Sequence, residues 1–394
     1  MFFQTLPKWF ETTPSRQPDS RSKLRVGIPK VLNVWSTHRF WLAFLTALGV
    51  DPRRIHFSSD TSEEQAREFA KGRGTVDCCY PVKCISGHYG ELLAREKKKL
   101  DVLFSPMIYS LPSFMHGHVT DSLACPRVMA APENIKAGFI KEEDAFAARG
   151  IKYAAPFVAL ADRPIVPKQL FEGLRDVFPG LTLRETQMAV DKGYAALEEF
   201  NDELRRRSRE VLNECAEHDR PCLLVLARPY HMDIGIGHEI EVDLQANGYP
   251  VLWGQYLPTD ADLLEWIFRD DLDAGIISSP FDISDVWPSS YSANTNEILW
   301  GAKVAARLPW VAGVIRLSSY ECGMDQPTYS PVQQIVERSG TLFFSFQDLD
   351  STKPAGSVKI RVETISFYLE KYSADIIAKK KAASPPACPL AAVA

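Results

Sequence analysis

The chain has 394 residues, of which 45% are hydrophobic and 24% are charged, and its formal net charge at pH 7 is −5. This length and composition exclude a disordered chain and predict two globular domains, each with its own core. The acidic balance argues against a nucleic-acid-binding protein, because such proteins gather a basic excess on one face. The most apolar stretch, residues 40–50, is too short to cross a bilayer, and the start of the chain lacks a secretory leader, so we expect a cytoplasmic protein without a membrane partner.

The first half of the chain alternates short apolar runs with helical patterns. Residues 1–22 are rich in Ser, Pro and Arg, and we expect them to form a flexible extension. Residues 23–160 are predicted to form the first α/β domain, because this alternation is typical of βαβ units and a parallel sheet. The predicted strands are 25–28, 55–58 and 101–105, with helices at 39–48 and after Pro81.

The second half repeats this alternation after a long helical, charge-rich stretch, residues 161–219, which we interpret as a linker. Residues 220–372 are predicted to form the second α/β domain, and residues 373–394 a disordered tail. The predicted strands are 222–227, 249–253, 274–278, 310–317 and 341–346, and the predicted helices are 239–247, 260–271, 294–307 and 360–372. The predicted fold class is therefore α/β, with two Rossmann-like parallel-sheet domains joined by a helical segment.

Three of the eight cysteines, Cys79, Cys125 and Cys322, lie in segments where a predicted strand meets a loop. Ligands of parallel α/β sheets collect at the loops that follow the strands, and thiolates are the preferred ligands of iron–sulfur clusters. Intervals of 46 and 197 residues contain no C-x-x-C pattern, so spacing alone favours three unrelated thiols. Metal ligation and unrelated thiols both remain open on these grounds.

The other cysteines give weaker signals. Cys84 and His88 stand four residues apart on a predicted helix, as zinc ligands can, but the neighbouring pair Cys78 and Cys79 is not expected to bind one tetrahedral ion together. Three further cysteines are interpreted as structural or incidental: Cys215 on a helix, Cys222 inside an apolar strand and Cys388 in the tail.

Arg228 and His231 directly follow the predicted strand 222–227 and are the strongest candidates for catalysis outside the cysteines. They could bind an anion or move protons, and His238 follows at the start of a helix. The loop 110–118 is expected to line a site, although its histidines, His116 and His118, are expected to be solvated rather than part of that site. No G-x-x-x-x-G-K-[ST] motif occurs, so we do not expect this chain to bind ATP.

Five segments, 25–29, 79–83, 228–231, 319–323 and 353–361, together resemble one family in order and spacing. Over about residues 23–372 the chain is similar to the carboxyl-terminal portion of the large acyl-CoA dehydratase activase fusion proteins, and through it to 2-hydroxyacyl-CoA dehydratase subunits and double-cubane cluster proteins. The resemblance implies that Cys79, Cys125 and Cys322 hold an iron–sulfur cluster between the two domains. The cluster would be a four-iron, four-sulfur cube or a sulfide-bridged double cubane, with one iron left open for chemistry.

The resemblance also implies a function. We expect an iron–sulfur oxidoreductase or dehydratase component that an ATP-dependent activase, carrying its own cluster, reduces, and that passes low-potential electrons to a small substrate or acyl-CoA. A homodimer is expected from the double-cubane relatives. Two alternatives stay open: a non-catalytic cluster-holding partner of the activase, and a metal-free protein that binds an anion through Arg228 and His231.

Overall fold

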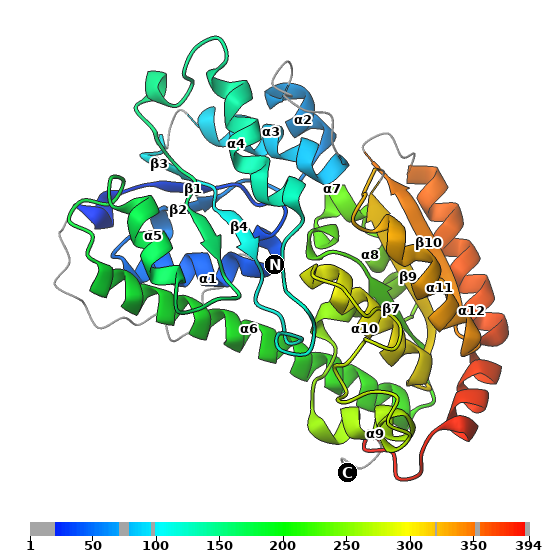
Figure 1. The fold of residues 1–394 in the computed structure, drawn as a ribbon. Helices are drawn as coiled ribbons and strands as arrows, with labels where there is room; N and C mark the ends of the chain where they lie inside the picture. Colours follow the sequence, from blue (N-terminus) through cyan, green and yellow to red (C-terminus); the bar gives the residue numbers. More distant parts are fainter. Residues whose placement is uncertain (1–19, 71–78, 96–98, 320, 351–354, 391–394) are drawn as a thin grey trace.

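The structure is a computed structural model that describes residues 20–70, 79–95, 99–319, 321–350 and 355–390. Within these residues the chain forms two four-stranded parallel sheets, each covered by helices, and one two-stranded parallel sheet. Figure 1 shows the two larger sheets side by side, with the N-terminal half on the left. The predicted fold class, α/β with Rossmann-like parallel-sheet domains joined by a helical segment, is confirmed.

The first sheet has the strand order β2-β1-β3-β5, with every pair parallel. Its strands are only three residues long and are buried at the centre, as parallel strands covered on both faces must be. A small parallel pair, β4 and β6, extends beside it. The strands are β1 (Val26–Ile28), β2 (Ile55–Phe57), β3 (Val102–Phe104), β4 (Met107–Ser110), β5 (Lys152–Ala154) and β6 (Phe157–Ala159), and the helices are α1 (Val34–Ala47), α2 (Glu63–Phe69), α3 (Tyr80–Leu93) and α4 (Pro126–Ile140).

The second sheet has the order β10-β9-β7-β8, again with every pair parallel. Numbered within each half, both four-stranded sheets have the order 2-1-3-4, so the halves share one topology although no sequence repeat is visible. The strands are β7 (Cys222–Leu226), β8 (Val251–Trp253), β9 (Val311–Ser319) and β10 (Leu342–Leu349), and the helices are α7 (Ile234–Gly237), α8 (Ile240–Ala246), α9 (Ala261–Asp273), α10 (Ala293–Arg307), α11 (Tyr329–Arg338) and α12 (Ala355–Ala383).

The segment between the sheets is helical, as predicted, and it belongs to both cores. It contains α5 (Val166–Leu174) and the 35-residue α6 (Leu183–Glu217). The first part of α6 packs Val190 and Leu197 into the core around α1, and its last turns place Leu212 in the core of the second sheet. In Figure 1, α6 runs below the first sheet and ends in the second half.

Short 3-10 turns connect several of these elements. Two of them bear on the site: η5 (Pro229–Met232) after β7 and η6 (Gly254–Tyr256) after β8. The others are η2 (Arg21–Lys23), η3 (Pro52–Arg54), η4 (Ala147–Arg149) and η7 (Gln326–Thr328).

The predicted strand 274–278 is wrong. Gly275 has a φ of 65°, and its N–H bonds to Leu272 O while the N–H of Ile276 bonds to Asp271 O. These bonds form a Schellman cap that ends α9, so the apolar run is a helix stop rather than a strand.

The predicted disorder at both ends also needs correction where residues are described. Residues 1–19 and 391–394 lie outside the described residues, but Arg21 is buried and donates to Pro179 O and Glu185. At the other end α12 continues to Ala383, and Trp266 Nε1 donates to Pro385 O. Residues 20–22 and 373–390 are therefore packed against the domains, because their polar groups complete hydrogen bonds there.

In the part of the chain that the structure describes, we find no helix with both the length and the apolar character needed to cross a membrane.

Candidate functional site

Cys79 and Cys125 each stand immediately before a helix. Cys79 is the N-cap of α3 and Cys125 the N-cap of α4, and both side chains are buried. Pro81 and Pro126 lie in the first turns, where proline starts a helix without losing a needed N–H donor. The positive ends of the two helices therefore lie beside the two cysteines and favour negative charge there.

Cys322 follows β9, at the carboxyl end of the second sheet. Its neighbour Glu321 has a φ of 64°, so the backbone turns sharply there. β9 pairs with β7, and the strand order reverses between these two strands. Such a reversal is a topological switch point, and α/β sheets bind ligands at the carboxyl ends of the strands there. Arg228 follows β7 at the same edge.

Each of the three cysteines lies near the segment after β7: Cys79 and Cys125 share a buried cluster with Tyr230, and Cys322 influences the pKa of Tyr230 and of Arg228. Burial raises the pKa of the Tyr230 hydroxyl, and Cys322 and Cys79 lie close enough to raise it further. Burial alone would lower the pKa of Arg228, but Asp325 and then Tyr230, Cys322 and Cys125 raise it well above its ordinary value. Segments that are 46 and 197 residues apart in sequence thus approach one place, between the helices α3 and α4 and the edge of the second sheet (Figure 1).

A buried charge cluster adjoins these thiols. Arg228 Nε and Nη2 donate to Asp325 Oδ1 at 3.1 and 3.0 Å, and Ser318 Oγ donates to Asp325 Oδ2 at 2.9 Å. Arg316 Nη2 lies 3.3 Å from that second oxygen, and all three charged side chains are almost completely buried. The two guanidinium groups hold the pKa of Asp325 well below its usual range, against the effect of burial.

The net charge of Arg228, Asp325 and Arg316 indicates whether the surrounding residues suit an iron–sulfur group. Two arginines share the one carboxylate of Asp325, which leaves a positive charge in excess, and Arg316 Nε has no hydrogen-bond partner among the described residues. Buried charge is costly unless it is compensated. An anionic cluster bound by Cys322 and Cys125 would supply that compensation, so the residues fit the group.

His231 is buried with both ring nitrogens in contact with polar groups. Nδ1 lies 3.2 Å from Arg228 O and Nε2 lies 3.2 Å from Ser319 Oγ. Burial lowers the pKa of His231 to about 4, so the ring is neutral at pH 7. Arg228 and His231 are thus brought to the cysteines, but they contact protein groups there; their catalytic roles stay predictions.

A second polar chain joins the two halves and fixes α3. Lys30 N–H donates to Ser58 Oγ at 2.8 Å, Ser58 Oγ lies 2.7 Å from His88 Nδ1, and His88 Nε2 lies 3.0 Å from Thr61 Oγ1. Thr61 Oγ1 then donates to Asp233 Oδ2 at 3.0 Å. The direction of these bonds assigns the ring proton of His88 to Nε2, and burial lowers the pKa of His88 to about 3. His88 therefore positions the helix that begins at Cys79.

Both ring nitrogens of His88 are used in these hydrogen bonds, whereas a zinc-ligating nitrogen needs a free lone pair. This arrangement argues against a zinc site at Cys84 and His88. Among the described residues, no group of three His, Cys, Asp or Glu side chains is arranged to bind one metal ion, and no two cysteines form a disulfide. A cube of four irons is bulkier than one ion, so its thiolates stand farther apart than the ligands of a single metal.

The remaining sequence candidates lie elsewhere. Cys215 and Cys222 lie together in the core of the second half, and Cys388 packs against the same core. His116 and His118 are exposed, and His118 contacts Ser279. Cys78 lies outside the described residues. The structure places Cys215, Cys222 and Cys388 in or against the core of the second half and His116 and His118 at the surface.

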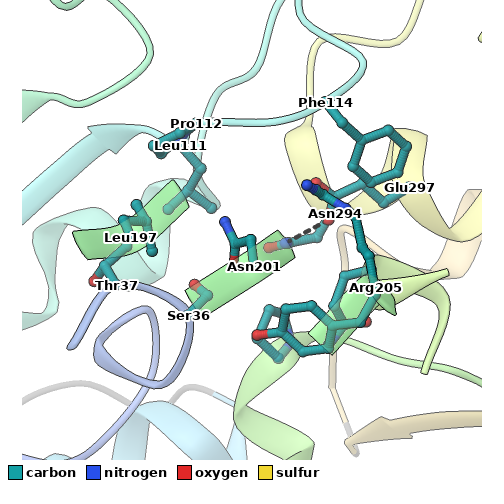
Figure 2. Close-up of a pocket in the computed structure, with 13 residues that line it drawn as sticks. Ser36, Thr37, Leu111, Pro112, Phe114, Leu197, Asn201, Arg205, Asn294 and Glu297 are labelled. Carbon is teal, nitrogen blue, oxygen red and sulfur yellow. Dashed lines mark hydrogen bonds between the residues drawn. The ribbon is translucent and has the colours of Figure 1, made fainter. Parts of the chain in front are cut away.

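The predicted site-lining loop does line a cavity between the two halves. Its volume is about 40 Å³, and Leu111, Pro112 and Phe114 form part of its wall together with residues of α1, α6, η6 and α10 (Figure 2). Glu297 on α10 lines it too, and burial raises the pKa of Glu297 to about 7. Sequence reasoning missed Glu297, which carries no local motif.

Arg316 and Asp325 were also missed, although the sequence holds a signal for each. Arg316 interrupts the apolar strand around Val314 and Leu317, and a charged residue inside a buried strand requires a partner. Asp325 stands three residues after Cys322. Only the fold reveals that Asp325 pairs with both Arg316 and Arg228.

Comparison with known proteins now identifies the family. Residues 25–257, more than half of the chain, match the family described as CoA enzyme activase uncharacterised domain (DUF2229). The chain therefore belongs to this family, which supports the link to acyl-CoA dehydratase activase proteins. The match includes Cys79, Cys125, Arg228 and His231 and ends before Cys322. No curated protein matches the chain.

Proposed function

We propose that this member of the CoA enzyme activase family is an iron–sulfur component that receives electrons from an ATP-dependent activase. Cys79, Cys125 and Cys322 would hold the cluster, which would pass low-potential electrons to a small substrate or acyl-CoA. The observation that supports the proposal is that Cys79, Cys125 and Tyr230 lie in one buried cluster, while Cys322, also buried, acts electrostatically on Tyr230 and Arg228.

The surrounding residues support this role in distinct ways. The positive ends of α3 and α4 and the excess charge of the Arg228–Asp325–Arg316 cluster would stabilise an anionic cluster beside them. Burial and Asp325 raise the pKa of the Cys322 thiol, so iron would have to displace its proton on binding. Burial of the three cysteines would keep water from the cluster and so tune its potential. His231, neutral and fixed by Ser319, would hold the turn after β7 in place beside it.

Similarity to the 2-hydroxyacyl-CoA dehydratase subunits and double-cubane proteins is the finer part of the proposal. With three protein thiolates, a four-iron cube keeps one iron for another ligand, which is where redox chemistry would be supplied. The family match supports the link to an activase. The substrate would be bound by the residues around this site.

The cysteine assignment is tested by paired variants purified without oxygen. Cys125→Ser should remove the visible absorption of the cluster, because it deletes one of three ligands, whereas Cys215→Ser should leave it unchanged, because Cys215 lies in the core of the second half. Absorption and iron content are measured on both. An equal loss of absorption and iron from the two variants would contradict the assignment of Cys125 as a cluster ligand.

A further inference from the structure

The cavity between the two halves contains polar groups that the protein leaves without partners. Gln255 is only 8% exposed and lines the cavity, yet its Nε2 has no hydrogen-bond partner among the described residues. Arg205 also lines the cavity, and its buried Nε has no hydrogen-bond partner among the described residues. Its Nη1 lies 3.4 Å from Asp202 Oδ1 at the surface. Buried donors without acceptors are costly, so an acceptor from a ligand would stabilise them.

The two residues come from different elements and line the same cavity. Arg205 projects from α6 and packs over the Phe114 ring at 5.3 Å, and Gln255 belongs to η6 in the second half. Figure 2 shows Asn201 and Arg205 reaching from α6 between Leu111 on one side and Asn294 and Glu297 on the other. Arg205, Asn201 and Phe114 are partly exposed, so the cavity reaches solvent.

We propose that this cavity binds a small carboxylate, held by Arg205 and Gln255. The guanidinium supplies a positive charge and the amide a second donor, while Leu111, Leu197 and Phe114 cover the apolar end of the ligand. A water needs about 10–15 Å³ on this measure, so the cavity has room for about three waters, which suits an acid of two or three carbons. The proposal goes beyond the cluster assignment and does not rest on it.

Glu297 would couple this binding to pH. Its carboxyl accepts from Ser113 Oγ at 2.9 Å and from Asn294 Nδ2 at 3.4 Å, and the charged or titratable groups that face it are Arg205, Arg228 and Tyr256. Protonated Glu297 tolerates a carboxylate beside it, whereas ionised Glu297 repels one. Binding should therefore weaken as the pH rises through about 7.

The site also adjoins the three cysteines. Arg228 Nη1 lies 3.5 Å from Asn294 Oδ1, and Asn294 in turn contacts Glu297. A ligand in the cavity would thus stand two contacts away from the guanidinium beside Cys322.

The test is a saturation-transfer NMR titration of the full chain with acetate and with its neutral isostere acetamide. Acetate should bind saturably and acetamide at least tenfold more weakly, because only acetate pairs with the charge of Arg205. Arg205→Met and Gln255→Leu should each weaken acetate binding about tenfold. The matched controls, Arg206→Met on the exposed side of α6 and Gln245→Leu on the surface of α8, should bind acetate as the unaltered chain does.

A second measurement covers the case in which the cavity variants fail to fold. If only the protein with protonated Glu297 binds, the dissociation constant for acetate should rise about tenfold between pH 6 and pH 8, and Glu297→Gln should abolish that rise. Three results would overturn the proposal: no saturable binding of acetate, equal binding of acetamide, or a pH profile that Glu297→Gln does not change.

Discussion

At the scale of single residues, the site depends on charge placed where water does not reach. Asp325 compensates Arg228 directly and Arg316 at 3.3 Å, and both guanidinium groups are nearly inaccessible. A buried ion pair is weak evidence for stability, but breaking one leaves an unpaired charge that is expensive. Asp325 is therefore the residue whose loss the site should tolerate least.

We predict that Asp325→Asn lowers the free energy of unfolding by about 3–5 kcal/mol, because two buried guanidinium groups lose their counter-charge. Urea unfolding at pH 7 measures this. The control Asp262→Asn removes an exposed carboxylate that pairs with Arg209, and should cost no more than about 1 kcal/mol. Equal costs for both would contradict the role given to Asp325.

The same carboxylate sets a pH dependence. The folded pKa of Asp325 lies below its ordinary value of 3.8, so its contribution is present above that value and is lost as the pH falls below it. The stability difference between the unaltered chain and Asp325→Asn should therefore shrink below about pH 4.

At the scale of elements, the end of α12 acts as a structural brace. Lys380 is buried, and its Nζ donates to Ala305 O, Leu308 O and Val311 O at 2.7, 3.2 and 2.8 Å. These carbonyls lie where α10 ends and β9 begins, the strand that leads to Cys322. The side chain thus satisfies three buried acceptors at the joint between the two elements.

We predict that Lys380→Met destabilises the protein by about 3 kcal/mol, because it leaves those carbonyls without a donor. Lys379→Met, one residue earlier on the exposed face of α12, is the control and should change the free energy of unfolding by less than about 0.5 kcal/mol. If the tail were disordered, as its composition indicates, the two variants would behave alike in urea unfolding.

Elements with a strong pattern were predictable, and short or capped ones were not. The apolar run at β7 and the long helical stretch of α6 were recognised from composition and length alone. β5 and β6 each begin with an exposed residue, Lys152 and Phe157, so neither is a buried run like β1 or β3. The run 274–278 was predicted as a strand because it is apolar, but apolar residues also accompany the glycine cap of a helix. Only the hydrogen bonds distinguish the two structures.

The candidate site was predictable only in its cysteines and in the turn after β7. Cys79, Cys125, Arg228 and Cys322 were found through strand ends and family resemblance. Glu297 and Gln255 carry no local signal, since their importance comes from lining a cavity that several distant segments form. Burial and pairing of this kind depend on tertiary structure.

At the scale of the whole molecule, the site requires the two halves to keep one arrangement. Gly235, on α7, contacts the loop after β2 so closely that an added Cβ would lie 2.1 Å from Thr61 O. Tyr80 OH donates to Gly235 O at 3.0 Å, which ties the start of α3 to the same place. Cys79 is thereby fixed relative to the edge that carries Cys322.

We predict that Gly235→Ala costs about 1–3 kcal/mol in the free energy of unfolding and lowers cluster occupancy, because the backbone of Thr61 must move and with it α3. Gly356→Ala on α12 is the control, since an added Cβ there meets nothing within 4 Å. Unfolding and iron content are compared for the two. If Gly235→Ala were destabilised but kept its iron content, the contact between Gly235 and Thr61 would not be needed for cluster binding.

The most direct test of the central claim is the amount of iron and acid-labile sulfide per chain, measured together with visible and electron paramagnetic resonance spectra on protein purified without oxygen. If Cys79, Cys125 and Cys322 hold the proposed cluster, the protein should contain about four irons and four sulfides per chain, with a signal that appears on reduction. Protein that contains no iron, or zinc in its place, would contradict it.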